Sequence, residues 1–189
     1  MPWVVFVLVL SAAVGKLRGG RLKNLADVRA TAWWLLLVSL AMQLAANLLP
    51  ASMADTSTVL VLASSLPILV MVWINRNAPG MWIAGIGILM NFTVIALNQG
   101  MPVLPAAIEI AGGAPNPVLD GRHIVLDSST HLPFLGDIIP LPGSVISLGD
   151  VFLAIGLGVF IEEEMRRSPR LFRRGVHAEG GSATDRGGR

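Results

Sequence analysis

Long runs of apolar residues, broken by short polar segments, dominate this chain. Four runs approach the roughly 20 apolar residues that a helix needs to cross a bilayer, and a shorter run lies at the N-terminus. Transmembrane helices are therefore predicted at residues 2–15, 31–49, 58–74, 80–98 and 147–163. We expect the first to be a retained span, because its basic residues follow the apolar run, whereas in a signal peptide they precede it.

The positions of lysine and arginine predict how these segments are oriented. Basic residues gather in three connections, which hold Lys16, Arg18, Arg21, Lys23 and Arg29; Arg76; and Arg166, Arg167, Arg170, Arg173 and Arg174. Cytoplasmic loops are enriched in such residues, so the pattern places the N-terminus outside and the C-terminus inside. Tryptophans favour the membrane boundary, and four lie at the predicted inner helix ends: Trp33, Trp34, Trp73 and Trp82. The predicted fold is an all-α bundle of five transmembrane helices in the cell membrane, a multi-pass protein.

The amino-acid composition agrees with a chain that is surrounded by lipid. Charged residues make up 14% of it, against about 25% in soluble proteins, and 53% of it is hydrophobic. The net charge of +2 arises mostly in the inner segments, so we expect anionic headgroups of the lipid bilayer to be its partner there, and no nucleic acid. The chain has no cysteine, which excludes disulfides and thiolate metal sites. No cofactor motif is present, and none is predicted.

The domain organisation is simple. Residues 1–164 are predicted to form one membrane-embedded domain, with a long outer loop at residues 101–146. Residues 165–189 begin with arginines and end in a glycine-rich polar run, so we predict a basic, partly disordered cytoplasmic tail.

Amide side chains follow two of the predicted spans. Gln43 and Asn47 are four residues apart in one, and Asn91 and Asn98 are seven apart in another, so each pair shares a helix face. Amides in hydrocarbon need partners inside the protein. We favour a seam of interhelical hydrogen bonds, and a polar path for a small molecule is the alternative.

The outer loop, residues 101–146, is too long for a simple connection and too apolar for a disordered one. Its frequent prolines preclude a spanning helix, so we predict an interfacial or partly re-entrant segment over the outer mouth. His123, Asp127 and His131 are spaced by four, which on a helix would align them for a metal ion. The run Ser128-Ser129-Thr130 favours a turn instead, so we assign no metal site.

Asp137 and Asp150 form the second candidate pair of the outer segment. Ser147 is a suitable N-cap for the last helix, and Asp150 lies at its third position, where a carboxylate stabilises the helix start. The structural interpretation of Asp150 is favoured on this ground. The alternative is that Asp137 and Asp150 share a proton and activate water.

Motifs in the outer segment resemble a known family. Asn98-Gln99-Gly100-Met101-Pro102-Val103, Gly121-Arg122-His123, the stretch Leu132-Pro133-Phe134-Leu135-Gly136-Asp137-Ile138-Ile139-Pro140, and Ser147-Leu148-Gly149-Asp150 running into Gly156 are similar to an uncharacterised bacterial membrane family, the domain of unknown function 5317. This resemblance covers most of the chain from the second span to the fifth. It implies a small multi-span membrane protein without a known activity.

A more distant likeness connects the chain to lipoprotein signal peptidases, which are membrane aspartic proteases. The matching positions are Asn98, Asp137 and Asp150. The last-helix motif departs from that family, since Ser-Leu-Gly-Asp stands where the family has an Asn-x-Ala-Asp type of sequence. The aspartates are also closer together here, and one more span is predicted.

Three function classes follow from these observations. We favour a non-catalytic membrane subunit or scaffold, whose outer loop binds lipid or an unidentified membrane-protein partner. A small-molecule or lipid carrier that uses the amide seam, and an aspartic membrane hydrolase that uses Asp137 and Asp150, are the alternatives.

Overall fold

The computed structural model describes residues 2–27, 30–114 and 122–167. Within them the chain forms six α-helices, three 3-10 turns and a four-stranded sheet. The helices are α1 (Pro2–Leu17), α2 (Trp34–Leu48), α3 (Ala54–Ile74), α4 (Met81–Asn98), α5 (Pro105–Ile110) and α6 (Leu148–Arg166). The 3-10 turns are η1 (Leu22–Asp27), η2 (Ala51–Met53) and η3 (Pro133–Leu135). The strands are β1 (Met101–Val103), β2 (His123–Val125), β3 (Asp137–Leu141) and β4 (Ser144–Ser147).

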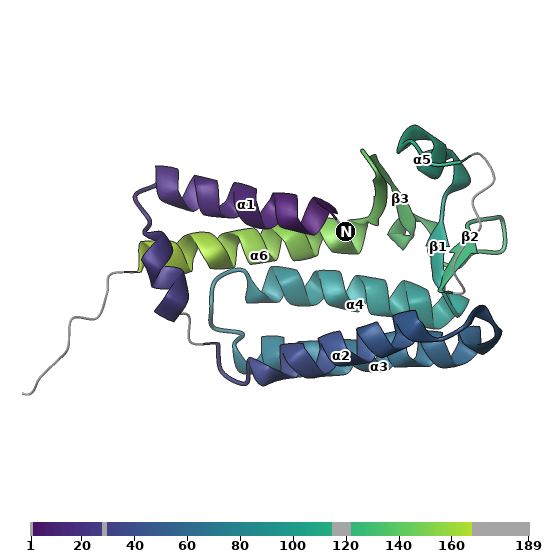
Figure 1. The fold of residues 1–189 in the computed structure, drawn as a ribbon, viewed down its shortest axis with the longest axis horizontal. Helices are drawn as coiled ribbons and strands as arrows, with labels where there is room; N and C mark the ends of the chain where they lie inside the picture. The colour runs from purple at the N-terminus through teal and green to yellow at the C-terminus, as the bar shows by residue number, and fades with distance from the viewer. Residues whose placement is uncertain (1, 28–29, 115–121, 168–189) are drawn as a thin grey trace, which may run out of the picture.

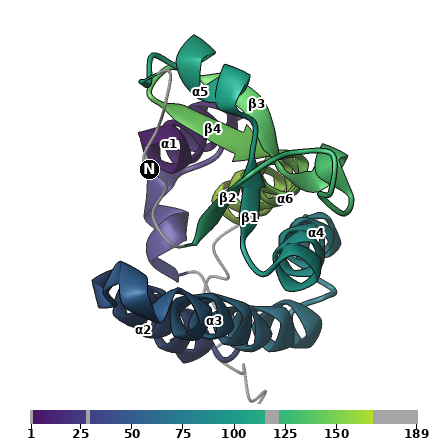
Figure 2. The same ribbon diagram turned by 90° about the vertical axis from the view of Figure 1, so that its right-hand side faces the viewer.

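The five longer helices form a curved row. α1 packs on α6, α6 on α4, α4 on α3, and α3 on α2. Figure 1 shows these helices running along the long axis of the molecule, and the end-on view of Figure 2 shows how the row curves. Their outward faces are rich in exposed apolar side chains, such as Leu66 on α3 and Leu89 on α4.

Two of these helices are long and apolar enough to cross a membrane, α3 and α4. The prediction of an all-α bundle of five spanning helices is therefore wrong. α1 has 16 residues and α2 has 15, which makes both shorter than a full span. α6 has 19 residues but carries Asp150 at its start and three consecutive glutamates near its end. The predicted spans 58–74 and 80–98 correspond to α3 and α4.

The outer segment departs furthest from the all-α prediction, because it folds into a sheet. The strand order is β2-β1-β3-β4, with β1 parallel to both β2 and β3, and β3 antiparallel to β4. Leu135 and Met101 of this segment pack on Val94 near the end of α4. The sheet therefore lies against the ends of the helix row, on the right in Figure 1.

The opposite end of the row is held by tryptophan and polar side chains around the α3–α4 turn. The rings of Trp73 and Trp82 meet edge to face with their centroids 5.9 Å apart, and the Arg76 guanidinium lies 4.9 Å above the Trp73 ring. Asn75 links this turn to the segment before α2, since its Oδ1 accepts a hydrogen bond from the Thr31 N–H at 2.9 Å.

The end of α6 meets the segment after α1 at this same end of the molecule. The Asn24 Nδ2 donates to the carbonyl oxygens of Met165 and Arg167, both at 2.8 Å, which caps the last turn of α6. Arg18 pairs with Glu162 at 2.8 Å. The predicted disordered tail, 165–189, falls largely outside the described residues, which end at residue 167 within it.

Candidate functional site

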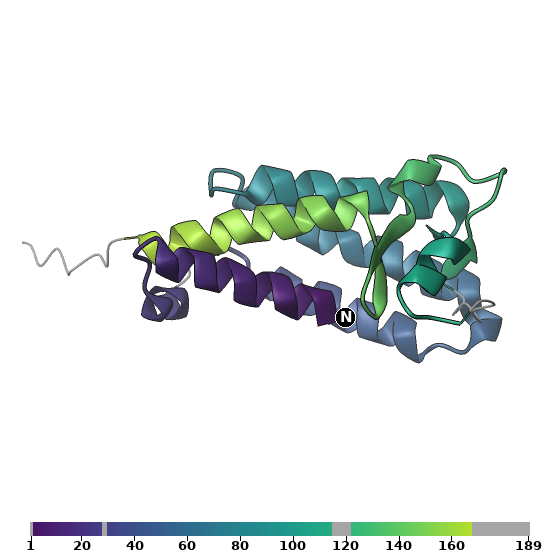
Figure 3. The same ribbon diagram turned by 90° about the horizontal axis from the view of Figure 1, so that it is seen from above.

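The register of one strand pair brings two distant aspartates to the same corner of the molecule. β3 and β4 pair with Asp137 opposite Ser147, and Ser147 is the N-cap of α6. Asp150 lies three residues further along, in the first turn of that helix. The corner is the junction between the sheet and the start of α6, and Figure 3 shows it from above.

Asp150 is held at the helix start by a reciprocal capping box. The Ser147 Oγ accepts a hydrogen bond from the Asp150 N–H at 3.0 Å, and the Asp150 Oδ2 accepts from the Ser147 N–H at 3.2 Å. This confirms the capping arrangement predicted from the sequence. The carboxylate also lies at the positive end of the helix dipole, which stabilises its charge.

A third residue, Asn91 of α4, completes this network. Its Nδ2 donates to the Asp150 Oδ1 at 2.9 Å, and its Oδ1 accepts from the Ser147 Oγ at 2.8 Å. Both oxygens of Asp150 therefore accept hydrogen bonds, one from its own helix start and one from the neighbouring helix. The orientation of the carboxylate is fixed by two separate elements.

Asn91 reaches α6 because small residues let the two helices approach closely. A side chain at Gly149 would overlap the Asn91 Oδ1 and the backbone oxygen of Gly87. One at Gly156 would overlap the backbone of Gly80 and Ala84. Glycine-lined crossings of this kind are common where membrane helices pack.

Asp137 lies in a different environment from Asp150. It is 8% exposed, and its Oδ1 is buried without a hydrogen-bond partner among the described residues. Burial raises the pKa of Asp137 to about 8, and the negative charge of Asp150 adds to the effect. Near neutral pH Asp137 therefore keeps its proton.

The second titratable residue near Asp137 is His123. β1 separates the two residues in the sheet, with Met101 opposite His123 and Val103 opposite Asp137. The His123 Nε2 is 3.9 Å from the Asp137 Oδ2, and 36% of the imidazole side chain is exposed. The imidazole therefore stands between the buried acid and the solvent.

The four residues of the predicted amide seam lie in separate parts of the structure. Gln43 of α2 donates to Ser39 of the same helix at 3.4 Å, and Asn47 is exposed. Asn91 belongs to the aspartate corner, and Asn98 lies at the end of α4. These four residues do not form one continuous polar path.

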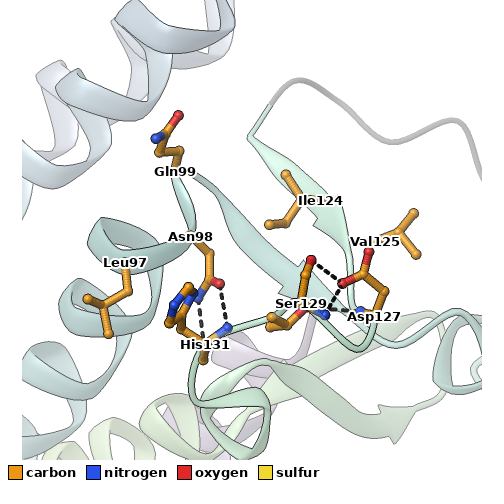
Figure 4. Close-up of a pocket in the computed structure, with 9 residues that line it drawn as sticks. Leu97, Asn98, Gln99, Ile124, Val125, Asp127, Ser129 and His131 are labelled. Carbon is orange, nitrogen blue, oxygen red and sulfur yellow. Dashed lines mark hydrogen bonds between the residues drawn. The ribbon is translucent and has the colours of Figure 1, made fainter.

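Asn98 instead fixes the loop that follows β2. Its Nδ2 donates to the His131 carbonyl oxygen at 2.9 Å, and its Oδ1 accepts from the His131 N–H at 2.8 Å. Together with Asp127 and Ser129 these residues line an open polar pocket of about 430 Å³, shown in Figure 4. The Ser129 hydroxyl and N–H, at 2.6 and 2.8 Å from the Asp127 Oδ1, lower the pKa of Asp127.

His123, Asp127 and His131 do not come together as a metal-binding set. His123 is in strand β2 and faces Asp137, whereas Asp127 and His131 line the pocket of Figure 4. Across residues 2–27, 30–114 and 122–167, no group of three metal-ligating side chains is arranged around a common point.

Comparison with known proteins connects this architecture to one family. The model of the family of unknown function DUF5317 matches residues 27–162, which run from the end of η1 to the last turns of α6. The chain belongs to this family. The residues matched include both aspartates, Asn91 and the whole sheet.

The DUF5317 protein is also similar to an uncharacterized protein of Thermotoga maritima. The two are 34% identical over 95 residues, which cover 47% of this chain. The alignment spans about half of the relative, 54% of its length. No solved structure matches the chain.

The residues that suggested a lipoprotein signal peptidase lie in two different places in the structure. Asp137 and Asp150 of the DUF5317 protein both lie at the junction of the sheet and α6, because Asp137 is opposite Ser147 and Asp150 is three residues beyond it. Asn98 is elsewhere, bound to His131, and Asn91 takes the position beside Asp150. Sequence reasoning missed the pairing of Asn91 with Asp150. The available signal was Gly149, which stands next to Asp150 in the chain and leaves room for a partner.

Proposed function

We propose that this DUF5317 protein is a membrane-bound hydrolase in which Asp137 and Asp150 act as a pair. The observation that supports this most is the corner itself. It holds a buried carboxyl group with an unpartnered oxygen next to a carboxylate whose two oxygens are fixed by hydrogen bonds. Two acids in environments that separate their protonation states are the usual basis of acid–base catalysis on water.

The reaction proceeds in two balanced steps. In the first, a water oxygen bonds to a carbonyl carbon, Asp150 takes one proton from that water, and protonated Asp137 gives its proton to the carbonyl oxygen. In the second, the bond from the carbon to the leaving oxygen or nitrogen breaks, and the leaving group takes the proton held by Asp150. One hydroxyl of the intermediate returns a proton to Asp137, so a carboxylic acid and an alcohol or amine are released.

The same proposal places the protein in the membrane as a multi-pass chain, with α3 and α4 crossing the bilayer as a hairpin. The turn between them carries Arg76 and the Trp73–Trp82 pair, which are residues typical of a cytoplasmic membrane boundary. The sheet would then lie on the outer side. Lys16, Arg18 and Lys23, all exposed, would meet anionic headgroups at the inner boundary.

A labelling experiment tests the proposed hydrolysis without knowledge of the substrate. Native membrane vesicles carrying the full chain are incubated in heavy-oxygen water, and new carboxyl groups that contain the heavy isotope are detected by mass spectrometry. We expect label above that of vesicles without the protein, and a loss of at least ~100-fold in the Asp137→Asn and Asp150→Asn variants. Glu109→Gln, which removes an exposed acid on α5, should label like wild type.

Two results would contradict the hydrolase. One is labelling no greater than in the empty vesicles. The other is labelling that both aspartate variants retain in full. Detection of each variant in the membrane fraction controls for loss of the protein.

A non-catalytic membrane subunit is the second candidate function. The observation in its favour is that the outer segment exposes large apolar side chains, with Ile110 74% and Phe134 57% exposed. Such side chains could bind lipid or a membrane-protein partner. In that case Ile110→Ser with Phe134→Ser would abolish co-purification of a partner, and Asp137→Asn would not. The carrier loses support, because Asn91 and Asn98 are bonded to neighbouring groups.

A further inference from the structure

The aspartate corner lies well below the end of α4. Asn91 is seven residues before Asn98, where α4 ends, and a helix rises about 1.5 Å per residue. Asn91 is therefore about 10 Å from the outer end of that helix. Because Asp150 is bonded to Asn91 at 2.9 Å, the carboxylate lies at the same level.

α6 begins at this level and not at the level where α4 ends. Figures 1 and 3 show its first turn well short of the far end of α4. The space beyond it is filled by the outer segment, whose Leu135 and Met101 pack on Val94 of α4. Asp137, at the start of β3, and Asp150, in the first turn of α6, thus lie where the sheet meets the helix row.

The outward surface of the helices at this level is apolar. Leu89, two residues from Asn91, is 50% exposed on α4, and Ile155, five residues further along α6 than Asp150, is also 50% exposed. If α4 crosses the bilayer, acyl chains surround the molecule at the depth of the acids.

We infer that the substrate is a membrane-embedded amphiphile whose reacting acyl carbonyl, an ester or an amide, lies inside the outer leaflet. This inference rests on the proposed function and on α4 as a membrane span. A water-soluble substrate would have to move about 10 Å below the end of α4 to reach Asp150. An amphiphile with a carbonyl along its acyl chain already holds that carbonyl in the layer where the acids are.

In this arrangement, water reaches the corner from the part of the sheet where His123 lies. Its imidazole is partly exposed and lies 3.9 Å from the Asp137 Oδ2. The hydrolytic water would then approach from the sheet, and the acyl substrate from the bilayer. The two reactants would meet at the corner without the site opening fully to solvent.

The test uses the full chain reconstituted in phosphatidylcholine vesicles and compares three synthetic probes at equal total concentration. The first is a water-soluble short-chain acyl ester. The second is a phospholipid with an additional ester inserted either close to the headgroup or at mid-chain. The third is a hydrophobic membrane-spanning peptide, which offers amide bonds. The rate compared between probes is the part of the hydrolysis rate that is lost in the Asp150→Asn variant and kept in the Glu109→Gln variant.

We expect a bilayer probe to be hydrolysed at least ~10-fold faster than the soluble ester, and the mid-chain ester faster than the ester near the headgroup. Preference for the lipid or for the peptide identifies the source of the carbonyl. Hydrolysis of the soluble ester at an equal rate, dependent on Asp150, would overturn the inference and leave the hydrolase standing. If no probe is hydrolysed and the native vesicles also acquire no heavy-oxygen label, both the inference and the proposed hydrolase would be overturned.

Discussion

At the residue scale, two aspartates in one corner are given opposite properties by what surrounds them. Asp150 has a hydrogen-bond donor for each oxygen, from Asn91 and from the backbone of Ser147. Asp137 is buried with an unpartnered oxygen. A buried carboxyl group avoids much of its desolvation cost by remaining protonated, so the fold itself keeps the proton on Asp137.

Asp137 makes the stability of the protein depend on pH. Its pKa is 3.8 in the unfolded chain and about 8 in the fold, so the native state holds the extra proton between these values. Its contribution to stability is complete below about pH 4, falls as the pH rises and is lost above about pH 8. Asp137→Asn should therefore be more stable than wild type at about pH 8, on the order of a few kcal/mol, and the gap should shrink toward about pH 4.

Thermal unfolding in detergent at several pH values measures this gap. Glu109→Gln, at an exposed position, serves as the matched control and should leave the pH dependence unchanged. A wild-type stability that does not fall between about pH 5 and pH 8 would contradict the burial of a protonated Asp137.

Gly149→Ala tests the contact between the two helices at the corner. The new methyl group would overlap the Asn91 Oδ1, so Asn91 must leave Asp150. We expect a loss of about 1–3 kcal/mol of stability and a loss of the heavy-oxygen labelling. Gly158→Ala is the control in the same helix, because its methyl group would meet only the Ser11 side chain, whose Oγ lies 3.0 Å away and can rotate. Equal effects of the two substitutions would argue against a specific role of Gly149.

At the element scale, α4 and α6 are joined along a line of small residues. Gly156→Val should destabilise the protein by at least about 2 kcal/mol, because its side chain would overlap the backbone of Gly80 and Ala84, which cannot rotate away. Ile155→Val, one residue earlier and exposed, should cost much less. Denaturant titration in mixed micelles, followed by circular dichroism, compares the two variants.

The elements that the sequence predicts well are those with local signals. α3 and α4 follow from long apolar runs, and the cap of α6 follows from Ser147 and Asp150, three residues apart. The strands have three to five residues each, too few for an alternating pattern to emerge. The register of Asp137 with Ser147 depends on contacts between distant segments, and no local pattern predicts it. The pairing of Asn91 with Asp150 also joins distant segments, and Gly149 marks only the space for a partner and not which residue fills it.

At the scale of the whole molecule, the basic and tryptophan-rich turn and the sheet lie at opposite ends of the helix row. This separation would give the proposed α3–α4 membrane hairpin a direction. The chain has no native cysteine, so single cysteines can report that direction directly.

Asn77→Cys lies in the α3–α4 turn and Ile110→Cys lies on α5, and both positions are exposed. In intact cells, a membrane-impermeant maleimide should label Ile110→Cys and should label Asn77→Cys only after the cells are opened. The opposite pattern would reverse the proposed orientation of the hairpin. Labelling of both positions in intact cells would exclude a hairpin that crosses the membrane.

If the proposed hairpin crosses the bilayer, the early start of α6 sets the depth of the aspartate corner in the membrane. Trp82, at the cytoplasmic boundary of the proposed hairpin, lies nine residues from Asn91, which is about 14 Å along α4. Boundary tryptophans hold this distance fixed from the inner surface, whereas the distance to the outer surface varies with the lipid. Lengthening the acyl chains of the host bilayer would submerge the acids, and shortening them would bring the acids up toward the ester region of the lipids. Turnover by this protein would then vary with the thickness of the membrane around it.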